Sequence, residues 1–326
     1  MKEVVVLAFD NCLTSSVIGL LDVFEISNNF SKMFTDNDQK LFNVSLASVD
    51  GRSVKSFSQF PIHVDKSVEE ISRADFIIIP PMMNEIEKVL ARNQRLVTWL
   101  IERHAQGSVL ASVCTGIFFL AEADLLEGKS VTTNPLMVSL FQQRYPAVET
   151  DVTRVLIDEG DILTAGPTYA FIDLVVFLIE KLGGSNLAMQ CSKLLLHDKN
   201  RKSQSPYFLS AMEQSHTDND VQRIQDWIQQ NRINAMTVED IALRFHMSPR
   251  NLVRRFRSAT GDTPLTYLQR LRVEDAKRKL ENSRRSVDQI TLDIGYSDAK
   301  SFGRLFKRMT TLSPSEYRKR FAAREL

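Results

Sequence analysis

Short apolar runs alternate with helical patterns through residues 1–183, and this alternation limits the fold more than any other feature of the chain. Four runs rich in Val, Ile, Leu, Phe and Ala are predicted strands, at residues 3–9, 41–49, 75–80 and 108–113. Helical patterns occupy residues 17–28 and 85–104. Strands that are apolar along their whole length are buried on both faces, as in parallel sheets covered by helices. The alternation therefore predicts a doubly wound, mostly parallel α/β sheet.

Further elements of the same kind follow along the chain. The run SVTT at 130–133 predicts another strand, and a helix is predicted at 136–144. Residues 152–166 carry two apolar runs separated by an Asp-Glu-Gly turn, which predicts a hairpin or a pair of strands. Residues 169–183 are nearly all apolar and predict a buried helix that a Gly-Gly pair should end.

The pattern changes near Asp198. The residues that follow are polar, rich in turn formers and without periodicity, which indicates an interdomain linker at 199–216. Every later segment has a helical pattern, so we predict an α/β domain at 1–198 and an all-helical domain at 217–326. A length of 326 residues fits two domains better than one.

The two predicted domains differ in charge. Residues 237–326 carry 20 Lys and Arg against 11 Asp and Glu, whereas residues 1–236 carry 21 against 29. The net charge of +1 therefore combines a basic C-terminal part with an acidic N-terminal part. This asymmetry indicates a nucleic-acid-binding domain joined to a domain of another kind. The alternative is a basic surface that only keeps a helical domain soluble.

Other bulk features exclude several classes of protein. Hydrophobic residues make up 43% and charged residues 25%, an ordinary globular composition, and no apolar run is long enough to span a bilayer. The first residues look like a strand rather than a signal peptide. Three scattered cysteines predict neither a disulfide framework nor a zinc site. We therefore expect a cytoplasmic protein without a metal ion, a cofactor or a membrane partner.

Residues 237–258 have the features of two helices joined by a short turn. Thr237 is a good N-cap, with Asp240 at the capping-box position. The second helix is predicted to have Ser248 as its N-cap and Pro249 at its first position, and to end just before a glycine. Two helices with a short turn between them form a helix-turn-helix unit.

The same pattern recurs at 286–309. Ser286 is the predicted N-cap of the first helix, Gly295 lies in the turn, and the second helix begins near Asp298. The residues between the two units form one long amphipathic helical pattern that begins with a Thr-Pro pair. A rigid helix there would hold two recognition helices at a fixed spacing, as two successive major grooves about 34 Å apart require.

The second helix of each unit is predicted to have an inner and an outer face. The apolar residues expected to pack inward are Leu252, Phe256 and Ala259 in the first unit and Phe302 and Phe306 in the second. The outer residues, most of them cationic, are Arg250, Val253, Arg254 and Arg257 in the first unit and Lys300, Ser301, Arg304 and Lys307 in the second. Cations on one exposed face suit the base edges and phosphates of a major groove.

These two units and the ending LSPSEYR resemble the AraC/XylS family of bacterial transcription regulators, over roughly the last 100 residues. The resemblance implies that six outer residues face DNA bases: Arg250, Val253, Arg254, Lys300, Ser301 and Arg304. It implies that Arg257 and Lys307 meet phosphates instead. Ala299 and Gly303 are small, so we expect the second unit to read fewer bases than the first.

The segment ASVCTGIFFLAEADLLEG, residues 111–128, places Cys114 between a predicted strand and a helix-like run. It resembles the nucleophile elbow of the PfpI-type, class I glutamine-amidotransferase-like fold, which is flavodoxin-like. Together with the AraC-type tail, the whole chain resembles the GlxA family of regulators. In active relatives the helix N-terminus beside such a cysteine favours the thiolate. A nucleophile also needs a base within hydrogen-bonding reach.

Other residues occupy the positions of the catalytic partners. The resemblance places Asn134 at the position of the family's histidine and Ser16 at the position of its acid, and asparagine cannot accept a proton at neutral pH. Pro80 and Pro81 stand where active relatives have a glycine-rich loop, and proline has no N–H group to offer an oxyanion. None of the five histidines is a good candidate base. We therefore predict no catalytic residues and no enzymatic activity.

Three interpretations of Cys114 remain. We prefer the wall of a ligand pocket, because open α/β sheets bind ligands at the carboxyl ends of their strands. The residues expected to converge there are Cys114, Thr115, Asn134, Pro81 and Thr168. The second interpretation is a redox sensor. The third is a small residue that a tight corner needs, with Gly116 allowing close helix packing.

These features together predict a sequence-specific transcription regulator, and the family resemblance favours an activator. Double-stranded promoter DNA is the expected partner of the helical domain, and a small-molecule effector of unknown identity that of the α/β domain. We also expect a homodimer, with RNA polymerase as a further candidate partner. The competing functions are a cysteine-dependent amidase or hydrolase fused to a DNA-binding domain, and a regulator that senses oxidation through Cys114.

Overall fold

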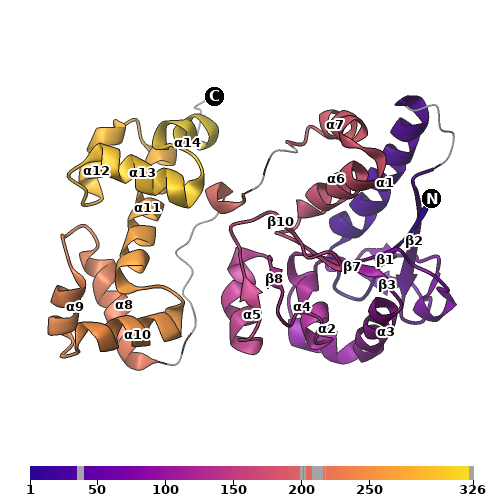
Figure 1. Ribbon diagram of the computed structural model, residues 1–326, viewed down its shortest axis with the longest axis horizontal. Coiled ribbons are helices and arrows are strands. Elements are labelled where there is room, and N and C mark those ends of the chain that lie inside the picture. Colours follow the sequence, from indigo (N-terminus) through magenta and orange to yellow (C-terminus); the bar gives the residue numbers. More distant parts are fainter. Residues whose placement is uncertain (35–39, 199–200, 202, 208–215, 217, 323–326) are drawn as a thin grey trace. The chain divides into compact units, whose positions relative to one another are not determined.

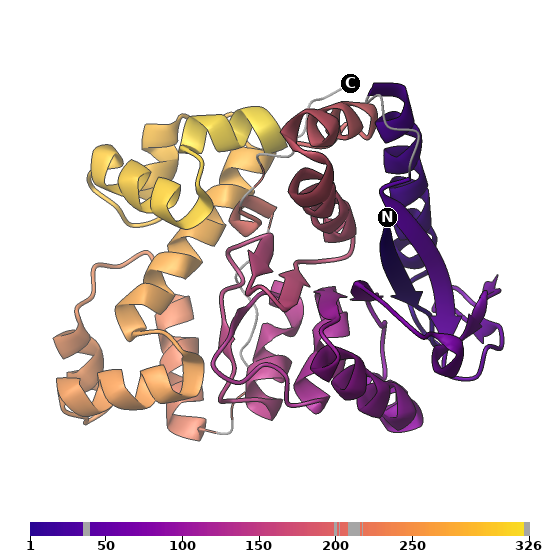
Figure 2. The same cartoon turned by 45° about the vertical axis from the view of Figure 1, so that its right-hand side comes forward.

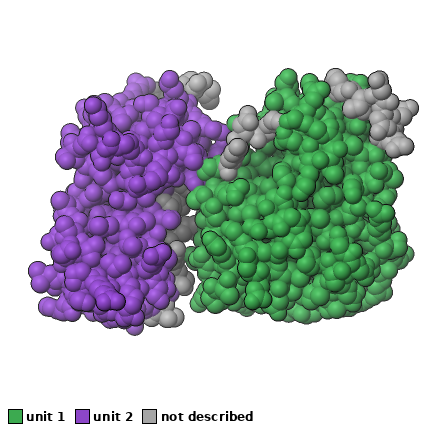
Figure 3. Space-filling model, in the orientation of Figure 1, with its two compact units in different colours: residues 1–204 green, residues 205–326 purple. Residues whose placement is uncertain are grey.

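The structure of the protein is a computed structural model that forms two compact units, residues 1–204 and residues 205–326 (Figures 1 and 3). Within the described residues, no helix is both long and apolar enough to cross a membrane. The residues that the structure describes are 1–34, 40–198, 201, 203–207, 216 and 218–322.

The first unit is built around a seven-stranded sheet. Its strands in spatial order are β10 (Leu156–Asp158), β11 (Ile162–Ala165), β7 (Val109–Val113), β6 (Phe76–Ile79), β1 (Lys2–Leu7), β2 (Phe42–Ser48) and β5 (Lys66–Ser67). All neighbouring strands are parallel except β10 and β11, which are antiparallel. This confirms the mostly parallel sheet and the paired strands predicted at 152–166.

Helices cover both faces of the sheet, because its central strands are apolar on both faces (Figure 1). One layer consists of α1 (Thr14–Phe34), α6 (Ala170–Gly183) and α7 (Ser185–Leu194). The other consists of α2 (Ile86–Arg92), α3 (Gln94–Ala105), α4 (Ile117–Glu122) and α5 (Val138–Arg144). Strand β1 lies between β2 and β6, so the order of the strands reverses beside it. The predicted doubly wound, flavodoxin-like fold is confirmed.

Some elements differ from their prediction. The helix predicted at 85–104 is interrupted at Asn93, whose side-chain amide donates to the Val89 carbonyl at 2.8 Å and separates α2 from α3. The strand predicted at 130–133 is the short β8 (Ser130–Val131), which pairs with β9 (Glu149–Thr150) outside the main sheet. Helix α7 and the small pair of strands β3 (Val54–Lys55) and β4 (Pro61–Ile62) were not predicted from the sequence.

The chain leaves the first unit later than predicted. Ser203 forms a β-bridge with Arg154, and the backbone N–H of the buried Gln204 donates to the Thr153 carbonyl at 2.9 Å. The end of the α/β domain is therefore corrected from residue 198 to residue 204. The short 3-10 turn Ser205–Tyr207 belongs to the second unit. The rest of the predicted linker falls mostly outside the described residues, at 199–200, 202 and 208–215.

The described part of the second unit is helical. Its helices are α8 (Asn219–Asn231), α9 (Val238–Arg244), α10 (Pro249–Thr260), α11 (Pro264–Asn282), α12 (Val287–Asp293), α13 (Ala299–Thr310) and α14 (Pro314–Phe321). Two separate apolar cores share α11: Leu268 and Leu271 belong to the core with α8, α9 and α10, and Val273 and Leu280 to the core with α12, α13 and α14. Figure 2 shows α11 running between the two bundles, as the long amphipathic pattern predicted.

Candidate nucleic-acid interface and pocket

Local sequence sets the helix ends of both helix-turn-helix units, as predicted. Thr237 and Asp240 form a complete capping box at the start of α9, and Ser286 forms one at the start of α12. The Ser248 hydroxyl accepts the Asn251 N–H at the start of α10. Each cap satisfies an N–H group that the first turn of the helix would otherwise leave unpaired, so these boundaries follow from a few neighbouring residues.

The two units form an internal repeat with one difference. Leu252 and Phe256 of α10 correspond to Phe302 and Phe306 of α13, 50 positions later, and all four side chains are buried. The capping residues Thr237 and Ser286 are only 49 positions apart. The turn before α13 is therefore one residue longer than the turn before α10.

The outer face of α10 carries the predicted residues. Arg250, Arg254 and Arg257 are exposed and Val253 is partly buried. They line a groove of about 820 Å³, together with Val238, Glu239, Pro249 and Ser258. The guanidinium group of Arg254 donates to the side-chain carbonyl of Asn251 at 2.9 Å, which limits the motion of this long side chain. The groove thus combines three cations with apolar side chains.

Arg255 is the remaining arginine of α10 and has a different role. Its guanidinium group forms ion pairs with Asp218 at 2.6 Å and Asp220 at 2.8 Å. These pairs connect α10 to the start of α8. Arg255 therefore stabilises the packing of the helices and is not part of the outer face.

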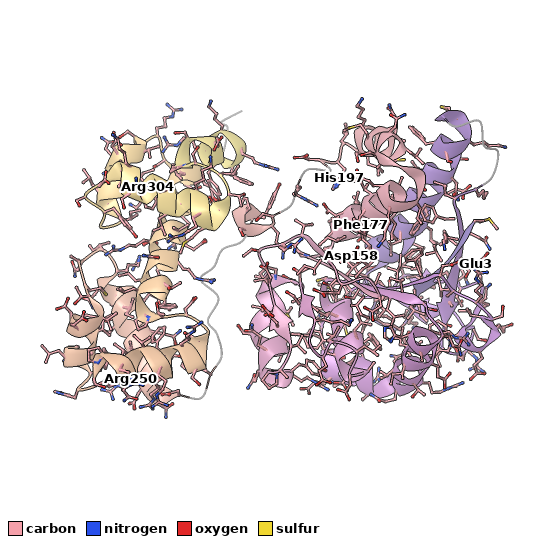
Figure 4. All side chains as sticks on the ribbon, viewed as in Figure 1. Glu3, Asp158, Phe177, His197, Arg250 and Arg304 are labelled. Atoms are coloured by element: carbon pink, nitrogen blue, oxygen red, sulfur yellow. The ribbon has the colours of Figure 1, made fainter. Side chains whose placement is uncertain are left out.

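The outer face of α13 repeats the pattern. Lys300, Ser301, Arg304 and Lys307 are exposed, as predicted. Figure 4 marks Arg250 on α10 and Arg304 on α13. The two helices belong to different cores on the shared helix α11, which supports two outer faces of similar charge within one unit.

The first unit has a cavity of about 470 Å³ where β6 and β7 end. Its lining residues are Met82, Met83, Asn84, Glu85, Ile86, Glu87, Lys88, Cys114, Thr115, Asn134, Met137 and Leu140. The wall thus combines apolar side chains, three of them from methionine, with amides and charged groups. Three of the five predicted residues, Cys114, Thr115 and Asn134, meet there.

Pro81 and Thr168 do not line the cavity, which corrects their prediction. Pro81 is buried, and its carbonyl accepts the Leu13 N–H at 2.9 Å, so its backbone is engaged by the chain just before α1. Thr168 accepts the Ser16 hydroxyl at 3.2 Å on its carbonyl and hydrogen-bonds with the Cys114 thiol through its backbone. Thr168 therefore helps to hold Cys114 in the cavity wall without lining the cavity itself.

The remaining lining residues were not predicted from the sequence. They are residues 82–88, which form the loop after β6 and the first turn of α2, together with Met137 just before α5 and Leu140 within α5. The loop directly follows β6, so the rule that ligands bind at the carboxyl ends of strands could have found it. No comparable signal marks Met137 and Leu140, because only the packing of α5 on α4 brings them there.

The corner at Cys114 has the strained shape of a nucleophile elbow. Cys114 has a φ of 55°, in the left-handed region that favours glycine. Gly116 is required beside it, because a Cβ at this position would lie 2.5 Å from the carbonyl oxygen of Ile79. The Thr115 hydroxyl donates to the Met82 carbonyl at 2.6 Å and accepts the Met82 N–H at 3.0 Å. These contacts fix the corner against the end of β6.

The Cys114 thiol is buried, and burial favours its protonated form. Its side chain is 1% exposed, and this burial raises its pKa above the ordinary value in spite of hydrogen bonds with Thr168, Thr115 and Asn134. Burial disfavours the charged thiolate, and it outweighs the helix terminus that was expected to favour it. The side chains of four histidines contact other groups: His63 contacts Ser53, His104 Asp161, His197 Asp173 and His216 Gln225.

We expect Cys114 to react slowly with iodoacetamide at neutral pH in the native protein. Its raised pKa leaves the thiol protonated, and each unit of pKa lowers the thiolate fraction about tenfold. Mass spectrometry of the peptide containing Cys114 measures the rate, with the urea-unfolded protein as control. Rapid labelling of the native protein would contradict this and would restore the interpretation as a redox sensor.

Two family models match the chain. Residues 2–181 match the DJ-1/PfpI family, and residues 241–320 match a helix-turn-helix domain. Each match falls within one of the two compact units.

Curated relatives match both units together. The chain is 28% identical to the HTH-type transcriptional regulator CdhR of Pseudomonas aeruginosa, over 93% of this chain and 88% of the relative. It is 23% identical to the HTH-type transcriptional regulator GbdR of the same species, over 96% and 83%. It is 26% identical to the HTH-type transcriptional regulator GlxA of Rhizobium meliloti, over 66% of each chain.

Solved structures share the fold over part of the chain. An AraC family transcriptional regulator from Pseudomonas putida aligns with a TM-score of 0.52 and 19% identity, over 60% of this chain and 100% of the other. A DJ-1 superfamily protein from Salmonella typhimurium aligns with a TM-score of 0.50 and 16% identity, over 61% and 100%.

Proposed function

Because this chain belongs to the DJ-1/PfpI family and carries an AraC-type helix-turn-helix region, we propose that it is a transcription regulator that binds promoter DNA and is controlled by a small effector. The observation that carries the proposal is the pair of matched cationic faces on α10 and α13, held by one connecting helix. Two recognition helices on one rigid helix suit two successive major grooves.

The residues of the two faces divide into two roles. Arg250, Arg254, Lys300 and Arg304 stand in the first half of each recognition helix and would read base edges, together with Val253 and Ser301. Arg257 and Lys307 lie further along each helix and would contact phosphates.

The cavity beside Cys114 is the proposed effector site. Cys114, Thr115 and Asn134 contribute to its wall, and its volume of about 470 Å³ is in the range of small-molecule pockets. We propose that this site binds its ligand without turnover, since burial keeps the Cys114 thiol protonated and its hydrogen-bond partners, Thr168, Thr115 and Asn134, cannot act as a base. The mixture of apolar and charged groups on the wall suits a small amphipathic molecule.

Gln204, the last residue of the first unit, is connected to the pocket wall by hydrogen bonds. The side-chain amide of Gln204 donates to the Thr133 carbonyl at 3.2 Å, and the Thr133 hydroxyl donates to the Cys114 carbonyl at 2.7 Å. Gly166 leaves room for this amide, because a Cβ there would overlap the side-chain oxygen of Gln204. We propose that a ligand touching Asn134, the neighbour of Thr133, acts on Gln204 through these hydrogen bonds. Such differential binding is what an effector needs to act on the rest of the chain.

Three further parts of the proposal rest on the likeness to AraC-type regulators. They are a homodimer, activation instead of repression, and a contact with RNA polymerase at the promoter. A cytoplasmic location is proposed on the same basis.

DNA selection with the full chain tests the DNA-binding half of this proposal. The protein should enrich one sequence from a pool of random duplexes of about 30 bp, long enough for two successive major grooves. We call the enriched sequence the selected duplex, and a permutation of its bases the scrambled duplex. Binding should weaken steeply with salt, because the protein displaces counterions from phosphates. Equal affinity for the selected and scrambled duplexes would contradict the proposal.

A matched pair of leucine variants tests the effector site. Leu140 lines the cavity and Leu136 does not, although both are exposed and four residues apart. A thermal-shift screen of metabolites on the full chain should find compounds that raise the Tm of the wild type. Leu140→Trp should abolish the shift by filling the cavity, and Leu136→Trp should retain it. Loss in both variants, or in neither, would place the effector elsewhere.

A further inference from the structure

Gly303 is placed where glycine is unfavourable. It lies within α13, which runs from Ala299 to Thr310, and the Asp298 side chain caps this helix by accepting the N–H groups of Lys300 and Ser301. Glycine is the poorest helix former after proline, because the helix must order its unusually free backbone. A glycine within a well-capped helix therefore needs a reason.

The described part of the chain supplies no such reason. Gly303 is not among the glycines with positive φ, so its conformation is open to any residue. A Cβ built on it would meet no heavy atom within 4 Å among its packing neighbours. Gly116 of the first unit differs in this respect, since it makes room for a backbone carbonyl.

The surroundings of Gly303 indicate an external reason. Lys300 lies three residues before it and Lys307 four residues after it, so all three share one side of the helix. Arg304 directly follows Gly303, and the three cationic side chains of Lys300, Arg304 and Lys307 are exposed. Bare backbone among three exposed cations permits a polyanion to approach the helix itself, which is a known use of glycine at sites of close contact.

The internal repeat allows Gly303 to be compared with the corresponding residue of α10. Fifty positions earlier, Val253 occupies the corresponding place on α10, and its side chain lines the groove between three arginines. The cations around the two positions correspond as well, with Arg250, Arg254 and Arg257 matching Lys300, Arg304 and Lys307. The centre of one recognition face therefore presents methyl groups, and the centre of the other presents backbone.

We propose that Gly303 is the point at which the second recognition helix comes closest to DNA, so that α13 lies deeper in its major groove than α10 does. This inference rests on the proposed function. The small size of Gly303 then has two effects. It removes one side chain that could contact a base, and it gives the duplex room to approach the helix.

Gly303→Ala and Gly303→Val in the full chain test the proposal against the selected and scrambled duplexes. We expect Gly303→Ala to raise the Tm, because alanine is the better helix former and has room. The same variant should bind the selected duplex at least tenfold more weakly than the wild type, and Gly303→Val should bind it more weakly still. Affinity for the scrambled duplex should change much less, since non-specific binding depends on phosphates.

A gain in stability with a loss of specific binding cannot come from damage to the fold, so the Tm serves as the control for each variant. Wild-type affinity of Gly303→Ala for the selected duplex would overturn the clearance role while leaving the proposed function intact. If the wild-type protein itself enriches no sequence, the proposed function fails, and the clearance role fails with it.

Discussion

The double variant Arg254→Ala, Arg304→Ala is expected to bind the selected duplex about 2–6 kcal/mol more weakly than the wild type, which is a loss of roughly 30-fold to more than 10,000-fold. A bidentate contact from arginine to a base is worth about 1–3 kcal/mol. The two arginines lie on helices that belong to different cores, so their effects should add. Fluorescence anisotropy with the selected duplex measures the loss.

The double variant Arg257→Ala, Lys307→Ala is the matched control. These residues stand one turn further along the same helices and are proposed to contact phosphates. They should weaken binding to the selected and scrambled duplexes alike, and lower the dependence on salt by about two counterions. If the Arg254 and Arg304 substitutions also weakened both duplexes equally, base reading by these two residues would be wrong.

Gly295→Ala is expected to destabilise the second unit by about 2–5 kcal/mol. Gly295 has a φ of 85°, where a residue with a Cβ is strained by roughly 1–2 kcal/mol. A Cβ at this position would also overlap the carbonyl oxygen of Ile233, and overpacking of this kind costs about 1–3 kcal/mol or more. The loss is measured as the change in the free energy of unfolding of the second unit, from thermal or urea unfolding of the full chain.

His246 supplies the control for this prediction. It is the corresponding turn residue of the first helix-turn-helix unit, 49 positions earlier, and it also adopts a positive φ, of 53°. It is exposed, so His246→Gly should relieve strain and leave stability unchanged or slightly higher. If Gly295→Ala were as well tolerated as His246→Gly, the close approach of Ile233 would not be the reason for the glycine.

The helix-turn-helix units were predicted in most detail, because local signals define them. Caps such as Thr237 and Ser286 act on N–H groups two or three residues away, and apolar residues recur at helical spacing. The outer face then follows by elimination, since Phe302 and Phe306 must point inward. The same logic located the strands of the sheet, which are too apolar to tolerate solvent.

The pocket was predicted only in part, because its wall comes from segments far apart in the sequence. The rule for parallel sheets correctly brought Cys114 and Asn134 together. It failed for Pro81, whose carbonyl is engaged by Leu13, and it passed over Leu140 on α5. Which side of a loop faces a cavity depends on packing that no local pattern encodes.

By itself, the sequence determined the order of the domains, the kind of sheet, the two helix-turn-helix units and the cationic residues on their outer faces. All of these depend on periodicity and capping within a few residues. Only the tertiary structure decided the protonation of Cys114, the end of the first unit at Gln204, and the open space around Gly303. Each of these depends on burial or clearance, which neighbours distant in the sequence create.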